Sequence, residues 1–273
     1  MAETPILTDR VALDHHRARA IKQPSLFLHE EAAFEIEERL AEVNKSYNEP
    51  VLVGHVTEPF RRMFPGSGAL SDTNNLNLPV NHHDLVLHLF GLHWADDPVG
   101  QIVQSRMALK PDGLFIAVLF GGSTLQELRA VLAETETRLT GGLSPRVVPM
   151  ADLRDFGALL HRGGLALPVA DSRKLKVRYP SLKKLVSDLR GMGETNALAA
   201  RHRAHLPKHF FDHVEELYLD RFSEDGYLIA SFELVFLTGW APDESQPQPL
   251  RPGTAKARLA DALGVSETPL ERE

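Results

Sequence analysis

The run Leu109-Lys-Pro-Asp-Gly-Leu-Phe-Ile-Ala-Val-Leu-Phe-Gly-Gly-Ser-Thr-Leu-Gln-Glu-Leu-Arg129 decides the fold of this 273-residue chain. Residues Leu114 to Phe120 are all apolar, which predicts a strand buried on both faces of a sheet. Pro111 cannot continue an α-helix, and Gly113 can adopt a positive φ, so a helix end and a turn are expected before this strand. Thr124-Leu-Gln-Glu127 has the pattern of a capping box, which predicts the start of a new helix.

The rest of the chain continues this alternation. Strands are expected at residues 51–53, 84–90, 165–170, 174–179 and 227–238, and helices at residues 30–43, 152–162, 181–192 and 207–222. A further helix is expected after Asp97-Pro98, with Ile102, Val103, Arg106 and Met107, before the stop at residues 110–113. Such alternation predicts a mostly parallel α/β sheet of the Rossmann-like kind, with added helices. Ligands bind such sheets beyond the carboxyl ends of the strands, which places Gly54, His88–Trp94 and Phe120–Thr124 near one mouth.

Composition excludes several classes of protein. The net charge of −7 argues against a general nucleic-acid binder, and no apolar run approaches the ~18–20 residues that would cross a bilayer. The chain has no cysteine, hence no disulfide or thiolate metal site. Residues 1–9 lack the order of a signal peptide, so we expect a cytoplasmic protein. We divide it into a lead-in (1–29), a main domain (30–241) and a flexible tail (242–273) with a possible short helix at 255–263.

Six segments of the chain resemble segments of a known family. Asp84-Leu-Val-Leu-His-Leu-Phe-Gly-Leu-His-Trp94, the Leu-Lys-Pro-Asp-Gly run, Phe120–Arg129 and Leu189–Asn196 resemble the class I S-adenosylmethionine (SAM) methyltransferases that include the malonyl-acyl-carrier-protein methyltransferase of biotin synthesis. Ala133-Glu-Thr-Glu and Gly141-Gly-Leu-Ser-Pro-Arg146 are most similar to the branch that contains a mitochondrial complex I assembly factor and its bacterial relatives. The resemblance spans about residues 5–250 and implies the methyltransferase fold and, for some members, arginine hydroxylation.

The cofactor half departs from this pattern. The family's glycine-rich loop is Asp-Leu-Gly-Cys-Gly-X-Gly, whereas Leu52-Val-Gly-His-Val-Thr-Glu58 keeps only Gly54. Val56 disfavours a positive φ, and Glu58 is expected to place negative charge where the cofactor carboxylate would lie. In the family an acid after the second strand binds the ribose, and a helix and a third strand follow. Asp72 is the candidate acid, but only eleven residues separate it from Asp84, so the sheet is expected to be shortened on one side.

Two functions remain open at this point. The first is a pseudoenzyme, a methyltransferase-like protein with an eroded SAM site that binds a protein partner as its assembly-factor relatives would. The second is an active SAM-dependent transferase in which Gly54, Asp72 and the backbone near His88 still hold the cofactor. The residues proposed for the substrate or partner pocket are His93, Trp94, Glu127, Arg129, Arg190, Glu194 and Asn196. No catalytic residue is assigned, and the oligomeric state is left open.

Two further patterns are interpreted as surface features. The histidines between His202 and His213 are spaced by three or four residues, but Pro207 interrupts them and no acid completes a set, so no metal is expected. Glu127 is expected to act first as the capping carboxylate of its helix. A basic strip is possible around Arg173, Lys174, Lys176, Arg178, Lys183, Lys184 and Arg190, with solvated strand and helix faces as the simpler interpretation.

Overall fold

The computed structural model describes residues 6–203 and 205–247. Met1–Pro242 forms one compact unit and Asp243–Glu273 a second, and the elements below all belong to the first. The helix expected at residues 255–263 lies outside the described residues, and the division into lead-in, main domain and tail stays a prediction.

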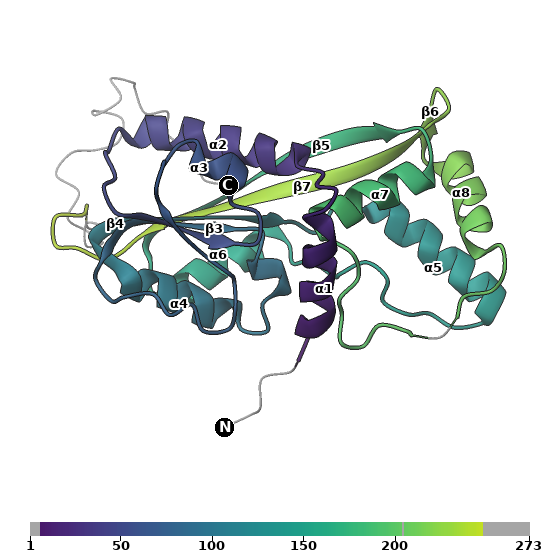
Figure 1. The fold of residues 1–273 in the computed structure, drawn as a ribbon, viewed down its shortest axis with the longest axis horizontal. Helices are drawn as coiled ribbons and strands as arrows, with labels where there is room; N and C mark the ends of the chain where they lie inside the picture. Colours follow the sequence, from purple (N-terminus) through teal and green to yellow (C-terminus); the bar gives the residue numbers. More distant parts are fainter. Residues whose placement is uncertain (1–5, 204, 248–273) are drawn as a thin grey trace, which may run out of the picture. The chain divides into compact units, whose positions relative to one another are not determined.

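The unit is built on one mixed sheet with the strand order β2-β1-β3-β4-β7-β5, and β6 pairs with the first residues of β7 (Figure 1). The first four strands of this order are parallel, whereas β7 is antiparallel to both β4 and β5. The strands are β1 (Pro50–Gly54), β2 (Gly68–Leu70), β3 (His83–Leu89), β4 (Leu109–Phe120), β5 (Ala166–Tyr179), β6 (Ser223–Glu224) and β7 (Tyr227–Trp240).

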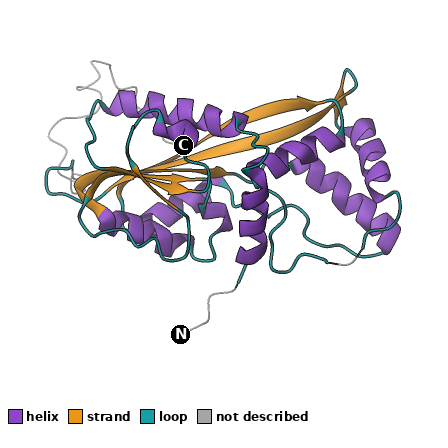
Figure 2. Cartoon of the chain, viewed as in Figure 1, coloured by secondary structure: helices purple, strands orange, loops and turns teal. Residues whose placement is uncertain are grey.

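Helices cover both faces of the sheet (Figure 2). They are α1 (Arg10–Ala20), α2 (Phe27–Val43), α3 (Glu58–Arg61), α4 (Pro98–Ala108), α5 (Gln126–Thr140), α6 (Leu153–Arg162), α7 (Leu182–Met192) and α8 (Phe210–Arg221), with a 3₁₀ turn η1 at Leu92–Trp94. None of the helices in the described ranges is long and apolar enough to cross a membrane.

Alternate residues of β4 supply two separate cores. Leu114, Ile116 and Val118 pack with α2, α5 and α7 on one face, while Phe115 and Ala117 pack with α4 and α6 on the other. A strand buried on both faces needs an unbroken apolar run, and each such side chain contributes about 1.5–3 kcal/mol on full burial. The prediction of a buried central strand at residues 114–120 is therefore confirmed.

The sheet is shortened at its β2 edge, as the sequence predicts. β2 ends at Leu70 and β3 begins at His83, and the structure describes the residues between them as loop and turn. The helix and third strand that the methyltransferase pattern places there are therefore missing from this chain. Asp72 is left on the loop that leaves the edge strand.

Three local predictions are wrong. Pro111–Gly113 does not form a turn between elements, because β4 already begins at Leu109 and absorbs these residues as an irregularity, with Asp112 at φ +59°. The capping box does not form, because α5 begins at Gln126 and the Thr124 hydroxyl bonds to the backbone of Glu233 instead. The two strands expected at 165–179 are the single strand β5, whose register shifts between Ala166 and Val169.

The basic strip is divided between two faces. Lys174, Lys176 and Arg178 alternate along one face of β5, whereas Leu175 and Val177 on its other face pack on the core that α7 also covers. The lysines of α7 and Arg190 therefore lie on a different surface, and the simpler interpretation of solvated faces fits this arrangement.

Candidate functional site

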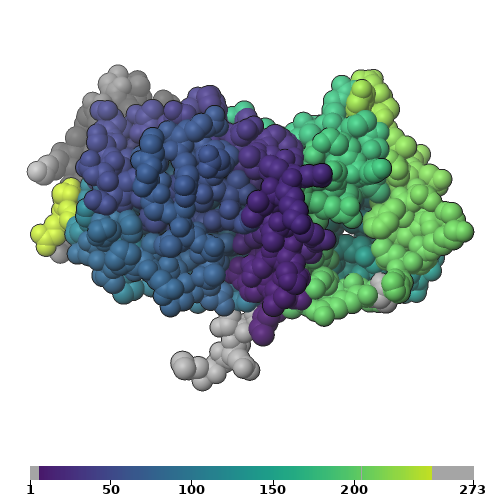
Figure 3. Space-filling view, viewed as in Figure 1, coloured from purple at the N-terminus to yellow at the C-terminus, as the bar shows by residue number. Residues whose placement is uncertain are grey.

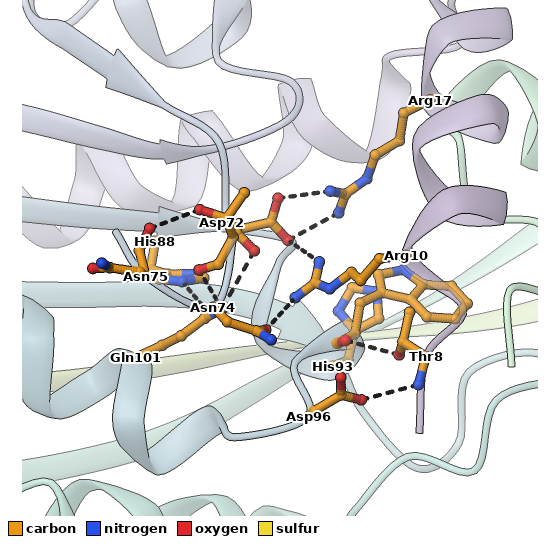
Figure 4. A network of polar contacts seen from close by, with 12 residues as sticks. Thr8, Arg10, Arg17, Asp72, Asn74, Asn75, His88, His93, Asp96 and Gln101 are labelled. Carbon is orange, nitrogen blue, oxygen red and sulfur yellow. Dashed lines mark hydrogen bonds and ion pairs between the residues drawn. The ribbon is translucent and has the colours of Figure 1, made fainter. Parts of the chain in front are cut away.

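The predicted cofactor acid, Asp72, is engaged by the N-terminal helix. Arg17 of α1 donates from Nη1 to Asp72 Oδ1 at 2.6 Å and from Nη2 to Oδ2 at 3.1 Å (Figure 4). Arg10 lies two turns earlier on the same face of this helix, and its Nη1 is 3.7 Å from Asp72 Oδ2. The Asp72 and Arg17 side chains are only 1% and 8% exposed. Burial acts to raise the pKa of the Asp72 carboxyl, but the Arg17 guanidinium outweighs it and holds that pKa below its ordinary value.

A glutamine fixes the backbone that carries this acid. Gln101 of α4 donates from Nε2 to the carbonyl oxygens of Asp72 and Thr73, at 3.3 and 3.1 Å, and its Oε1 lies 2.9 Å from Nε2 of His88. Because the amide oxygen can only accept, His88 carries its proton on Nε2. Burial lowers the pKa of His88 to about 4, so the imidazole is neutral near pH 7. His88 thus supports the Asp72 loop through Gln101.

Gly54 has a packing role that needs no cofactor. A Cβ at this position would lie 2.4 Å from the Leu89 carbonyl oxygen and 2.9 Å from Leu89 Cβ. Only glycine lets the end of β1 approach β3 this closely. The presence of one glycine of the expected loop is therefore explained by packing alone.

Gly54→Ala tests this packing role. We expect it to lower the free energy of unfolding by about 1–3 kcal/mol, because the added methyl group overpacks a rigid backbone contact. Urea denaturation measures the change. Gly68→Ala is the matched control, because its Cβ would meet only Val51 Cγ2 at an ordinary 3.8 Å. Equal stability of both variants would contradict the packing role.

A second polar group joins η1 to the loop that follows α7. Glu194 Oε2 accepts from Trp94 Nε1 at 2.8 Å and lies 3.0 Å from His93 Nε2. The side chains of His93 and Glu194 are 2% and 8% exposed. Burial acts to raise the pKa of Glu194, but His93, followed by Arg17, outweighs it and lowers that pKa, so the group is a carboxylate. The expectation that His93, Trp94 and Glu194 lie together is met.

Glu194 stands at the polar end of an apolar pocket of about 240 Å³. Both Trp94 and Asn196 line it, and Asn196 is held there because its Nδ2 donates to the Pro145 carbonyl at 2.8 Å. The remaining walls come from β4, β7, α5, α7, α8 and the loops next to them: Phe120, Thr124, Leu125, Leu128, Leu132, Arg146, Val147, Val148, Met150, Val186, Leu189, Thr195, Phe211 and Phe232.

Three residues proposed for this pocket are placed elsewhere. Glu127 is buried against β7, where it accepts from the backbone and hydroxyl of Ser231 at 3.0 and 2.5 Å, so it is not the capping carboxylate expected either. Arg129 donates to the carbonyl oxygens of Gly122 and Thr124 and so ties α5 to the glycine hinge. Arg190 is exposed on α7. These three residues are close in sequence to residues that line the pocket, but they do not line it themselves.

A cavity of about 410 Å³ lies beside Asp72, on the cofactor side. Arg10, Arg17, His55, Ser71 and Asn74 contribute to its lining. Of the loop after β1, His55 reaches this cavity, whereas Glu58 is exposed at the first residue of α3 and does not line it. Both Asp72 oxygens face Arg17, so the arrangement does not fit a ribose bound at this acid.

Arg17 and Gln101 were not identified from the sequence. Arg10 and Arg17 are seven residues apart and so share one face of a helix, which was an available signal for a paired cationic face. Nothing local in the sequence connects them to Asp72. In the described residues, no group of three histidine, aspartate or glutamate side chains is placed to hold a metal ion.

Comparison with known proteins identifies relatives of this chain. The chain is 35% identical over 205 residues to "Arginine-hydroxylase NDUFAF5, mitochondrial" of Rattus norvegicus, covering 75% of this chain and 60% of that one. It is 31% identical over 184 residues to a malonyl-acyl-carrier-protein O-methyltransferase of Laribacter hongkongensis, covering 67% and 60%. The chain thus spans about three fifths of the length of these relatives. No family model matches the chain.

Likeness to solved structures is looser. The YcgJ protein of Bacillus subtilis superposes with a TM-score of 0.48 at 13% identity, covering 78% of this chain and 99% of that one. The relationship therefore rests on the sequence matches and on the topology of the sheet. The chain is a homologue of the NDUFAF5 proteins and of malonyl-acyl-carrier-protein O-methyltransferases, built on the α/β fold of class I SAM methyltransferases.

Proposed function

We propose that this protein acts without SAM and binds a protein partner through the pocket beside Glu194. The observation that carries the first part is the Arg17–Asp72 ion pair. A bidentate guanidinium–carboxylate pair is a strong, geometrically specific interaction, and here it engages both oxygens of the acid expected to bind the ribose. The chain thus places a cation of its own where the family pattern requires a free carboxylate.

The pocket beside Glu194 has the chemistry of a site for a basic side chain. His93 and Trp94 both bond to Oε2, and among the described residues no donor bonds to Oε1. The pocket walls are apolar and suit the aliphatic stem of an arginine or lysine, while the free oxygen suits its cationic end. The name of the NDUFAF5 relatives, arginine-hydroxylase, supports a protein arginine as the occupant. In this proposal His93 and Trp94 orient the Glu194 carboxylate. The protein would then bind its partner in the role of an assembly factor.

A second candidate function is methyl transfer with a divergent cofactor site. The 410 Å³ cavity beside Asp72 favours this second function, because movement of Arg17 would leave the Asp72 carboxylate free to bind a ligand in the cavity. In that case Asp72, Ser71 and Asn74 would hold the cofactor, which would supply the methyl group, and Glu194 would position the acceptor.

Calorimetric titration with SAM and with S-adenosylhomocysteine separates the two functions. We expect no binding heat with either ligand at millimolar concentration, because Asp72 is occupied by Arg17. Arg17→Ala is the informative variant, since it frees the carboxylate, and Arg19→Ala on the exposed side of the same helix is its control. Micromolar binding to the unaltered protein that disappears in Asp72→Ala would refute the cofactor-free proposal.

A further inference from the structure

The segment Leu7–Ala20, here called the N-terminal clasp, contacts both walls of the Glu194 pocket. On the η1 side, the amides of Leu7 and Thr8 donate to Asp96 Oδ1 at 2.8 and 3.0 Å, and the Thr8 hydroxyl donates to the Trp94 carbonyl at 2.8 Å (Figure 4). Figure 3 shows this segment in purple on the surface, between the blue part of the chain on the left and the green part on the right. The clasp therefore holds the element that carries His93 and Trp94.

The same segment holds the loop that carries Glu194. Thr8 and Leu198 form an antiparallel bridge, in which the Asp9 amide donates to the Ala197 carbonyl at 2.8 Å and the Ala199 amide donates to the Leu7 carbonyl at 2.9 Å. Further along, His16 Nδ1 lies 3.2 Å from the Thr195 carbonyl oxygen. One short segment thus joins two pocket walls that are about a hundred residues apart in sequence.

Polar contacts dominate the attachment of the clasp. Of its apolar side chains only Leu13 and Ala20 are buried, and Val11 is 66% exposed. A segment held by few buried apolar contacts can open locally at a free energy below that of global unfolding. The Arg17–Asp72 pair is more buried than the other ion pairs of the described clasp residues and acts as the lock.

Arg17 also connects the lock to the pocket. Its stem lies against Gly193, where an added Cβ would come within 3.1 Å of Arg17 Cγ and 3.4 Å of Arg17 Cα. Gly193 has φ +81° and immediately precedes Glu194. Departure of α1 would therefore remove a cation near Glu194 and the surface on which its loop rests.

We propose that the N-terminal clasp is a gate that opens and closes the Glu194 pocket, with the Arg17–Asp72 ion pair as its lock. The gating rests on the pocket assigned in the proposed function, but it requires neither a bound cofactor nor an identified partner. Closed, the clasp draws η1 and the 193–201 loop together over the pocket. Open, it exposes Trp94 and frees Asp72 at the same time.

A disulfide across the bridge tests the gate. Thr8 and Leu198 form a non-hydrogen-bonded antiparallel pair, whose Cα atoms are typically about 4.5 Å apart, within the range of about 4.4–6.8 Å that disulfides span. The chain has no cysteine, so Thr8→Cys with Leu198→Cys gives one defined bond. Trp240→Phe in the same protein leaves Trp94 as the single tryptophan. Acrylamide quenching of its fluorescence then reports the opening of the pocket.

The reduced and oxidised forms of this one protein are matched controls for each other. We expect the quenching constant of Trp94 to be at least about twofold higher in the reduced form, because only that form can open locally. Arg17→Lys in the reduced protein is expected to raise the constant further, since lysine cannot make the bidentate pair. Equal constants in the two forms, or failure of the disulfide to form in the folded protein, would overturn the proposal.

Amide hydrogen exchange of the unaltered protein provides a second measurement. The amides of Asp9 and Ala199 are expected to exchange at least about tenfold faster than those of β4, because clasp opening is local whereas β4 is exposed only by global unfolding. Exchange of all these amides at one common rate would exclude a separate gate. Neither measurement uses SAM or a partner. The gating proposal can therefore be refuted while the proposed function stands, and the proposed function can be refuted while the gating proposal stands.

Discussion

Arg17→Met is expected to lower the free energy of unfolding by about 3–5 kcal/mol at pH 7, because the buried Asp72 carboxylate loses its bidentate partner and keeps the longer contact to Arg10 at 3.7 Å. For a chain of this size the loss corresponds to a fall in melting temperature on the order of 10 °C. Methionine retains most of the aliphatic stem that packs on Gly193, so the charge and its hydrogen bonds are the main loss. Thermal and urea unfolding of the two proteins measure the difference.

The pH dependence of this difference has a definite sign. In the unaltered protein the pKa of Asp72 lies below its ordinary 3.8, so the pair stabilises the fold above that value and its contribution is lost as pH falls through the folded pKa. In Arg17→Met, burial without the cation raises the pKa of Asp72, and protonation then relieves the cost. The gap in stability between the two proteins should therefore begin to narrow above pH 3.8, as pH falls through the raised pKa of the variant, and stop narrowing once Asp72 of the unaltered protein is also protonated.

Arg19→Met is the matched control for this experiment. Arg19 lies on the same helix but is exposed, and its Nε donates only to the His15 carbonyl at 3.3 Å. A surface change of this kind is expected to stay within about 0.5 kcal/mol. A loss for Arg17→Met no larger than that for Arg19→Met would mean that the buried pair contributes nothing to the stability of the fold.

Glu194→Leu is expected to be the second most damaging change. It leaves two buried donors, Trp94 Nε1 and His93 Nε2, without an acceptor, and each orphaned group costs about 1–3 kcal/mol. We expect a loss of about 3 kcal/mol in the free energy of unfolding, measured by urea denaturation, together with loss of the proposed partner binding.

Glu194→Gln separates the two consequences of that change. The amide oxygen can still accept from Trp94, so most of the stability should remain. The negative charge is lost, so binding of a basic side chain should fall by at least about tenfold, since charge-assisted bonds are worth about 1.5–3 kcal/mol. If Glu194→Gln lost as much unfolding free energy as Glu194→Leu, the charge of Glu194 would be needed for stability. If partner binding were unchanged in Glu194→Gln, the assignment of this pocket as the binding site would be wrong.

The sequence was sufficient for the central part of the fold. The apolar runs at residues 84–90 and 114–120 predicted buried strands, because a strand covered on both faces has no polar position to interrupt it. The short spacing from Asp72 to Asp84 predicted the missing strand and helix, since chain length alone limits what can form there.

Local motifs failed where a distant strand competed for the same groups. Thr124 and Glu127 have the spacing of a capping box, yet both bond to β7, more than a hundred residues later. The role of Arg17 was missed for the same reason, because an ion pair across 55 residues leaves no periodic trace in one sequence. The structure places His93, Trp94 and Glu194 together. The first two follow the carboxyl end of a strand, where such sheets bind ligands, and the glycines before Glu194 indicated a tight loop that could face the same pocket.

The position of β7 has a consequence for how the chain folds during synthesis. This strand is the last of the sheet to be made, yet it lies between β4 and β5 and pairs with both along most of their length. Until residues 227–240 leave the ribosome, two long strand edges remain open, and pairings of such high sequence separation form slowly. These edges are therefore expected to stay unpaired, and prone to aggregation, for longer than in a fold whose strands pair in the order of synthesis.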